Sequence, residues 1–437
     1  MYHETYTKQA KVEICYTLIM INSVQKKILI LALYAGEIML RSGAEIYRVE
    51  DTVVRICKAC NIGFVECFAT TTGIFLSIDS GDEESDMHTF IKRIKSSEIN
   101  LSRISAVNTF SRAFTRTDLS IDEGFERLKT IGAAPRYHVL LRLLGAVLIG
   151  AFFCPLMRGA ISDMLVAGVI SGITFLISNG VDRLGFPDFI RIFISCAAAA
   201  GMVLAASAMG VCSSISPIVV ASTVIFLPGV AITNAARDLL SGDMLSGVAR
   251  FTEACIAAVA IAGGVGIGIQ IWLYGGGSIA HDRIEAFTEP WFFLFGFCTT
   301  FGLGLLFNAP KKLLIPVALI GAAGMFILDY MTQTYSHIAA SFFGTCAMAI
   351  LAEFASRAGK DATTIFIIPG IVPFVPGVLL YETMSNMLVG DYAEAVSIGA
   401  QALIIAGCIA LALALVATVA RLILATATRL GGAASRR

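Results

Sequence analysis

Residues 226–243 read Phe226-Leu-Pro-Gly-Val-Ala-Ile-Thr-Asn-Ala-Ala-Arg-Asp-Leu-Leu-Ser-Gly-Asp243 and lie within the apolar part of the chain. A weaker copy recurs as Ile367-Ile-Pro-Gly370 and Val389-Gly-Asp391. A Pro-Gly pair removes a helix hydrogen bond and adds backbone freedom, so we expect each copy to break a membrane-spanning helix near the middle of the bilayer. Two broken helices in corresponding halves of one chain are expected of a transporter's substrate site.

The composition indicates a membrane protein. Hydrophobic residues make up 57% of the chain and charged residues 15%, and the mean hydropathy is +0.79, above the usual range of soluble domains. The formal net charge is zero, so nothing points to nucleic acid. Residues 1–138 hold a large share of the charges, which predicts one soluble domain followed by one membrane domain. The N-terminus lacks a charged n-region, an apolar h-region and a cleavage site in the order of a signal peptide. We therefore expect the soluble domain to stay in the cytoplasm.

The soluble domain is predicted to be α+β. Apolar residues at helical spacing, and a capping box at Ser120-Ile-Asp-Glu123, indicate helices. Stretches rich in β-branched and aromatic residues, or with alternating polarity, indicate strands. The helices are expected over residues 24–41, 45–60 and 120–132, and the strands over residues 62–69, 73–78 and 91–95.

Two groups in this domain could carry chemistry. A charged cluster either binds a polar metabolite or is a solvated helix face; its members are Glu45, Arg48, Glu50, Asp51 and Arg55. The pair Cys57-Lys-Ala-Cys60 has helical spacing and either packs in the core or binds a metal or redox partner. No phosphate-binding loop or hydrolase motif is present, and the five histidines are scattered. We therefore predict no metal site, no cofactor and no enzymatic activity.

The rest of the chain contains ten apolar runs of spanning length. They are centred near Ala146, Gly172, Ala200, Ser222, Ala262, Thr300, Gly321, Thr345, Val372 and Ile409. With the soluble domain inside the cell, most loop cations fall on the cytoplasmic side, as the positive-inside rule requires. Both termini are then cytoplasmic, in a multi-pass protein of the cell membrane.

The two Pro-Gly copies fall in the fourth and ninth predicted spans. Each half then has five spans, and an odd number forces the halves into opposite orientations. The predicted fold is thus an all-α membrane domain of two inverted five-helix repeats with broken helices. The repeats cover residues 139–275 and 290–425, and residues 426–437 form a cytoplasmic tail.

Three motifs resemble those of the bacterial threonine/serine exporter family. They are residues 42–52, the segment 228–250 and Pro369-Gly-Ile-Val-Pro-Phe-Val-Pro-Gly377. The resemblance covers residues 25–425. It implies efflux of small hydroxylated amino acids driven by the proton motive force, with both halves fused in one chain. Relatives with other substrates leave small dicarboxylates such as succinate open as an alternative.

The broken helices suggest the substrate site. After Pro228 and Gly229, unpaired backbone N–H groups and the positive end of a helix dipole suit a substrate carboxylate. Thr233 and Asn234 lie one turn further on and could hydrogen-bond a polar ligand. In the second copy, exposed carbonyl groups are expected to take the ammonium group. The residues assigned there are Pro369, Gly370, Pro373, Pro376, Gly377 and Tyr381.

Charged residues near membrane depth are candidates for gating and coupling. Arg237 and Asp238 either gate the site or form an interfacial ion pair that ends the span. A carboxylate shielded from water can carry a proton, and the candidates are Asp329, Glu353 and Glu382. The expected partners are a small-molecule substrate, protons and the lipid bilayer; a homo-oligomer stays open. The rival classes are a passive channel and a membrane-embedded enzyme, and the latter lacks a visible nucleophile and base.

Overall fold

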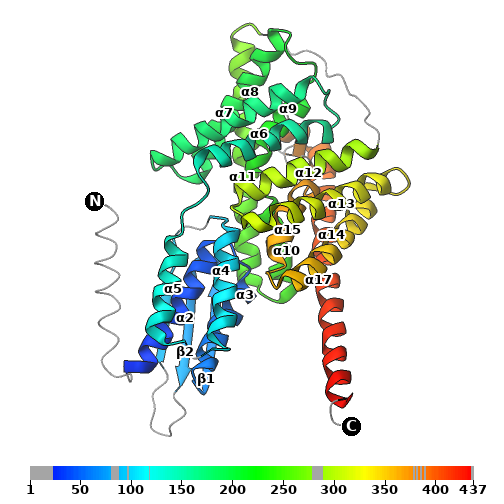
Figure 1. Ribbon diagram of the computed structural model, residues 1–437. Helices are drawn as coiled ribbons and strands as arrows, with labels where there is room; N and C mark the ends of the chain where they lie inside the picture. Colours follow the sequence, from blue (N-terminus) through cyan, green and yellow to red (C-terminus); the bar gives the residue numbers. More distant parts are fainter. Residues whose placement is uncertain are drawn as a thin grey trace. The chain divides into compact units, whose positions relative to one another are not determined.

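The computed structural model divides the chain into two compact units, Met1–Pro135 and Arg136–Arg437 (Figure 1). We call them the N-terminal and the C-terminal unit. The description below covers residues 23–79, 88–95, 98–117, 119–277, 289–376, 379, 382–383, 386–387 and 390–434.

The N-terminal unit contains helices and one sheet. The helices are α2 (Ser23–Arg41), α3 (Ile46–Ala59), α4 (Leu101–Phe114) and α5 (Ile121–Ala133). The strands β1 (Phe64–Thr70), β2 (Gly73–Asp79) and β3 (His88–Arg93) form an antiparallel sheet in the order β1-β2-β3. One face of the sheet packs against α2 and α3, which buries Ile74, Leu76 and Ile78.

Local sequence signals explain these elements. Along α3, Ile46, Val49, Val53 and Ile56 are completely buried, as their helical spacing predicts. The predicted capping box is present: the Ser120 hydroxyl accepts from the backbone N–H of residue 123, whose carboxylate accepts from the backbone N–H of Ser120. The predicted strands at 62–69 and 73–78 correspond to β1 and β2, each shifted by no more than two residues.

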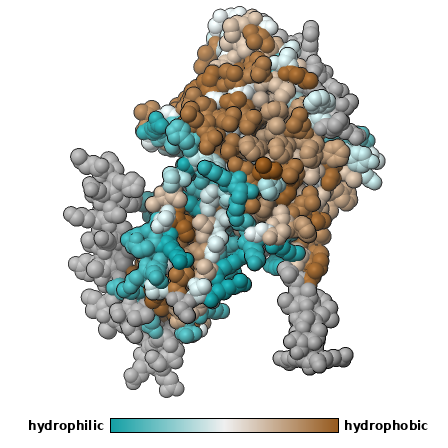
Figure 2. Space-filling view, in the orientation of Figure 1, coloured by the Kyte–Doolittle hydropathy of each residue, from teal (hydrophilic) through white to brown (hydrophobic). Residues whose placement is uncertain are grey.

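The C-terminal unit is helical throughout its described residues. Its elements are α6 (Val139–Leu156), α7 (Asp163–Arg183), α8 (Asp188–Ala208), α9 (Ser216–Thr223), η1 (Val224–Phe226), α10 (Gly229–Ser241), α11 (Met244–Tyr274), α12 (Glu289–Leu306), η2 (Lys311–Leu313), α13 (Leu314–Thr332), α14 (His337–Gly359), α15 (Thr364–Ile371), η3 (Val372–Phe374) and α17 (Tyr392–Ala434). Their apolar side chains cover most of the visible face of this unit, whereas the N-terminal unit is mainly hydrophilic (Figure 2).

By length and composition, seven helices among the described residues can cross a membrane, or eight if α9 and α10 form one bent span. The chain is therefore a polytopic membrane protein. Two further apolar helices, Trp291–Leu306 and Thr364–Phe374, are shorter than a full span. Each of the ten predicted centres lies in a helix, but ten complete spans stay a prediction.

The order and lengths of several helices in the first half of the C-terminal unit recur in its second half. The eight residues of α9 and the three of η1 recur as the eight of α15 and the three of η3, with Ser216 matched to Thr364 and Val224 to Val372. This shift of 148 residues continues along the chain. It matches Gly242 with Gly390, which have φ angles of 93° and 91°, and the first residue of α11 with that of α17.

The helix pairs of the two halves correspond as well. In the first half α7 packs against α6 and α9, and α11 against α8; in the second, α13 packs against α12 and α15, and α17 against α14. The halves meet where α6 crosses α12. A Cβ atom on Gly145 would lie 2.8 Å from the carbonyl oxygen of Gly302, and one on Gly302 would lie 2.7 Å from that of Gly145. Only glycine allows this approach, as is common between membrane helices.

Candidate substrate site

The first broken helix lies where the Pro-Gly pair predicts it. Helix α9 tightens into η1, Leu227 is extended with φ −58° and ψ 127°, and α10 begins at Gly229 after Pro228. The two arms, Ser216–Phe226 and Gly229–Leu239, are bent by 59°. Proline suits this position because it has no N–H to leave unsatisfied at a helix start.

The second helix does not break at Pro369 and Gly370, so that prediction is wrong. Both residues lie inside α15, which continues to Ile371 and then into η3. Gly370 serves close packing instead: a Cβ atom there would lie 2.8 Å from the sulfur of Met348. Every residue of α15 is buried, and this tertiary packing holds the helix together despite the proline.

The second break comes after Phe374. Val375 is extended, with φ −65° and ψ 136°, and precedes Pro376. The shift of 148 residues therefore pairs Leu227-Pro-Gly229 with Val375-Pro-Gly377. Pro373 lies within η3. Gly377 and Tyr381, assigned to the site from the sequence, lie outside the described residues.

The two breaks touch. A Cβ atom on Gly229 would lie 3.2 Å from Cγ2 and 3.3 Å from Cβ of Val375. Residues nearly 150 positions apart thus bring two non-helical backbone segments together inside the helical unit. Such backbone is tolerated at membrane depth only where protein or a cavity surrounds it.

Two polar side chains follow the first break. Thr233 is 4% exposed, and its hydroxyl donates to the carbonyl of Gly229 at 2.8 Å. Asn234 is 3% exposed, and its Nδ2 has no hydrogen-bond partner within the described part of the chain. A buried amide N–H left without an acceptor costs about 1–3 kcal/mol. This amide group is therefore suited to donate to a polar ligand.

A buried ion pair anchors the far end of α10. Asp238 Oδ2 lies 3.1 Å from Arg250 Nε, and their side chains are only 2% and 11% exposed. Arg250 belongs to α11, so the pair fixes α10 to the next helix. The preceding residue, Arg237, is half-buried and interacts electrostatically with Asp238 and with Glu353 of α14. Positive charge from the first half thus faces a carboxylate from the second.

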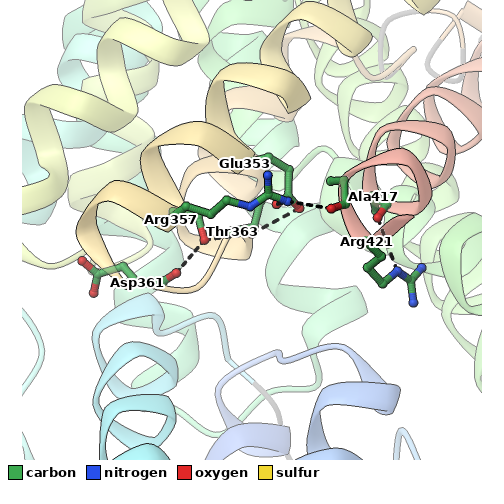
Figure 3. Close-up of polar contacts among 8 residues, drawn as sticks. Glu353, Arg357, Asp361, Thr363, Ala417 and Arg421 are labelled. Carbon is green, nitrogen blue, oxygen red and sulfur yellow. Dashed lines mark hydrogen bonds and ion pairs between the residues drawn. The ribbon is translucent and has the colours of Figure 1, made fainter. Parts of the chain in front are cut away.

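Glu353 belongs to a polar network (Figure 3). Its Oε2 lies 3.2 Å from Nη2 of Arg357, and its Oε1 accepts from the hydroxyl of Thr363 at 3.4 Å. Arg357 also donates to the carbonyl of Ala420 in α17 at 3.3 Å. The network links α14, the start of α15 and α17 around one carboxylate.

The same network continues along the chain. Thr363 and Ser356 share a hydrogen bond of 3.0 Å, and Ser356 donates to the carbonyl of Asp361 at 2.7 Å. The Asp361 carboxylate lies 3.2 Å from Nζ of Lys312. Among the predicted coupling carboxylates, Glu353 thus has partners both in its own helix α14 and at the start of α15.

The other two coupling candidates lie elsewhere. Asp329 is partly exposed, near the C-terminal end of α13. Glu382 is also partly exposed, and its carbonyl accepts from the side-chain amide of Asn386 at 2.9 Å. Glu382 is the counterpart of Asn234 under the shift of 148 residues.

Sequence reasoning missed Arg250, Arg357 and Val375. It treated the two arginines as loop charges, although both lie inside helices. A signal for the true second break was available. The number of residues from Pro228 to Gly242-Asp equals the number from Pro376 to Gly390-Asp, so the interval pairs Pro228 with Pro376.

The charged cluster of the N-terminal unit is not a simple solvated face. Asp51 and Arg55 form an ion pair in which both side chains are substantially exposed. Glu45, however, is completely buried and pairs with Arg48. Glu50 accepts from the backbone N–H of Ala69 at 2.8 Å, which ties α3 to β1. Glu45 and Arg48 thus form a local pair at the start of α3, and Glu50 fixes α3 to the sheet.

The cysteine pair of this unit is suited to packing. Cys57 is completely buried, and this burial, with a smaller contribution from neighbouring Cys60, raises its pKa to about 12. A thiol that stays protonated at neutral pH is a poor nucleophile and a poor metal ligand. No group of metal-ligating side chains was found among the described residues.

Comparison with known proteins identifies the family. A family model described as "Putative threonine/serine exporter" matches residues 30–272, and a second, "Threonine/Serine exporter, ThrE", matches residues 292–419. The chain belongs to the threonine/serine exporter family. Within this family the two matches follow each other in one chain, so both parts are fused here, as the sequence motifs predicted.

Two curated proteins are similar to this family member along most of its length. One is the "Probable threonine/serine exporter" of Mycobacterium tuberculosis, 22% identical over 387 residues, which are 84% of this chain and 71% of the relative. The other is the "Threonine/serine exporter" of Corynebacterium glutamicum, 21% identical over 368 residues, which are 81% of this chain and 74% of the relative. No solved structure matches.

Proposed function

We propose that this protein is a secondary transporter that exports threonine, serine or similar small polar amino acids across the cell membrane. Family membership and the names of both curated relatives support this substrate class. They give no support to dicarboxylate export. A transporter also fits a unit with seven or eight apolar helices long enough to cross a membrane.

The substrate site, in this proposal, lies where the two broken helices meet. The observation that carries it is the contact between Gly229 and Val375. The N–H of Gly229 donates to the carbonyl of Leu227 at 2.7 Å. The next amides of α10 have no acceptor within their own helix and suit the substrate carboxylate. The unpartnered amide of Asn234 adds a donor one turn further on. Carbonyl groups freed around Val375 and Pro376 suit the ammonium group, in place of those expected at Pro369.

The proposed coupling ion is the proton. Glu353 is the favoured carrier because Arg237, Arg357 and Thr363 all act on its carboxylate. Protonation of Glu353 would weaken its attraction to both arginines and so alter the contact between the two halves. Asp329 and Glu382 are the alternative carriers.

The proposed topology has ten spans in two inverted repeats, with both termini in the cytoplasm. The matching element plans of the two halves support a repeat, and five segments per half would give them opposite orientations. The loop cations support the placement of the termini.

The test is counterflow of labelled serine, threonine and succinate into proteoliposomes that contain the full chain. We expect exchange of serine and threonine, and uphill transport that a protonophore abolishes. Converting both Pro228 and Gly229 to Ala should abolish exchange, whereas Pro369→Ala, inside α15, is the matched control and should retain most of it. Exchange of succinate alone, or equal losses in both variants, would contradict the proposal.

A further inference from the structure

No described element packs against one face of the sheet in the N-terminal unit, and this face carries a row of large apolar side chains. Strand register places Phe68 opposite Phe75, and Phe75 opposite Ile91. These three side chains are 50%, 37% and 67% exposed. Phe64 lies four residues before Phe68 on β1 and therefore on the same face, where its side chain is 40% exposed. The opposite face is covered by α2 and α3.

This row is unusual for a unit whose surface is otherwise hydrophilic. The rings of Phe68 and Phe75 lie 6.0 Å apart, so the cross-strand neighbours form one continuous patch. Contiguous exposed apolar groups rimmed by polar residues are typical of an interaction surface. The rim here includes the hydroxyls of Ser77 and Thr89, which hydrogen-bond to each other at 2.8 Å.

The charges beside the row identify the partner. Glu66 lies on the β1 edge of the face, between Phe64 and Phe68 and in register with Ser77 and Thr89. Arg93 lies at the opposite corner, in register with Gly73 and Thr70. Within the described residues neither forms an ion pair. Among the described side chains of this face, Glu66 and Arg93 therefore lie diagonally opposite each other across Phe75.

Such a face is complementary to itself. Consider a two-fold axis in the plane of the contact that passes through Phe75 and is perpendicular to the line from Glu66 to Arg93. It places Arg93 of each copy against Glu66 of the other, and Phe75 against Phe75 of the other copy. The strands then cross at a steep angle, close to the orthogonal class of sheet packing. We propose that this face, formed by Glu66, Phe68, Phe75, Ile91 and Arg93, joins two copies of the chain.

A lipid surface is the less favoured partner. The cytoplasmic leaflet is anionic, and it would attract Arg93 but repel Glu66. A second copy satisfies both charges at once. Face-to-face sheets lie about 10 Å apart, so a short bismaleimide bridges cysteines at the axis while a direct disulfide does not.

The experiment uses full-length protein in native membrane vesicles. Phe75→Cys is treated with the bismaleimide, and the chain with its native cysteines only gives the baseline. Lys58→Cys, on the exposed side of α3, is the matched control. We expect cross-linked dimers from Phe75→Cys and a baseline level from Lys58→Cys.

A charge exchange then tests the partner. In the Phe75→Cys chain, Glu66→Arg or Arg93→Glu alone should lower the dimer yield roughly three- to tenfold, because two like-charge contacts replace two surface ion pairs. The double exchange should restore the yield, which also shows that the single variants fold. Equal cross-linking from Lys58→Cys, or no recovery in the double exchange, would overturn the proposal. So would a baseline yield from Phe75→Cys itself, the result expected if this face lies on an anionic lipid surface.

Discussion

The contact between the two breaks can be tested by adding and then removing volume. In Gly229→Val the new Cβ would lie 3.2 to 3.3 Å from atoms of Val375, and two further methyl groups would follow it. Overpacking of this size costs about 1–3 kcal/mol. Because the strain falls on both breaks, we expect a loss of serine counterflow together with a lower free energy of unfolding.

The companion change is Val375→Ala, which removes two methyl groups from the other side of the same contact. The double variant should regain stability and part of the transport. Gly180→Val is the matched control, since a Cβ atom at Gly180 has no neighbour within 4 Å, and its stability should stay within about 1 kcal/mol of the parent. Unfolding in a denaturing detergent measures stability, and proteoliposomes measure transport. If Gly229→Val behaves like Gly180→Val, or if Val375→Ala gives no recovery, the breaks do not meet in the working protein.

Three further predictions follow from the described contacts. Arg250→Met should destabilise the protein by about 3–5 kcal/mol because it removes one partner of a buried ion pair, and Asp238→Leu in the same chain should recover most of the loss in detergent unfolding. Glu353→Gln should abolish uphill transport but keep serine exchange, whereas pH-dependent uphill transport by this variant would exclude Glu353 as carrier. Cys57 should react with iodoacetamide far more slowly in the folded protein than in the unfolded chain at pH 8, because its side chain is buried. Because burial raises the Cys57 pKa from 9.0 to about 12, the unfolded thiol loses its proton first, and the N-terminal unit should lose stability as pH rises through that window.

Local signals in the sequence predicted most of the helices and strands. The capping box at Ser120 and the apolar spacing along α3 depend on neighbouring residues, so they could be recognised without tertiary information. The first break was predictable for the same reason: Pro228 and Gly229 combine a missing N–H with a flexible backbone.

The second break was mispredicted because two Pro-Gly pairs compete within nine residues. Pro369 alone suggests a break, but α14 and its Met348 pack so closely on Gly370 that the helix is retained. The partners of Glu353 and Asp238 were also beyond local reasoning. Arg250 and Arg357 reach them only once the helices are packed, and no spacing rule links Asp238 with a residue of the next helix.

The length of α17 sets a mechanical property of the C-terminus. Its 43 residues make a rod about 65 Å long at 1.5 Å per residue, while the hydrocarbon layer is about 30 Å thick. Even its apolar part, Tyr392–Ile423, exceeds that thickness, so α17 must either tilt in the bilayer or extend beyond the hydrocarbon layer.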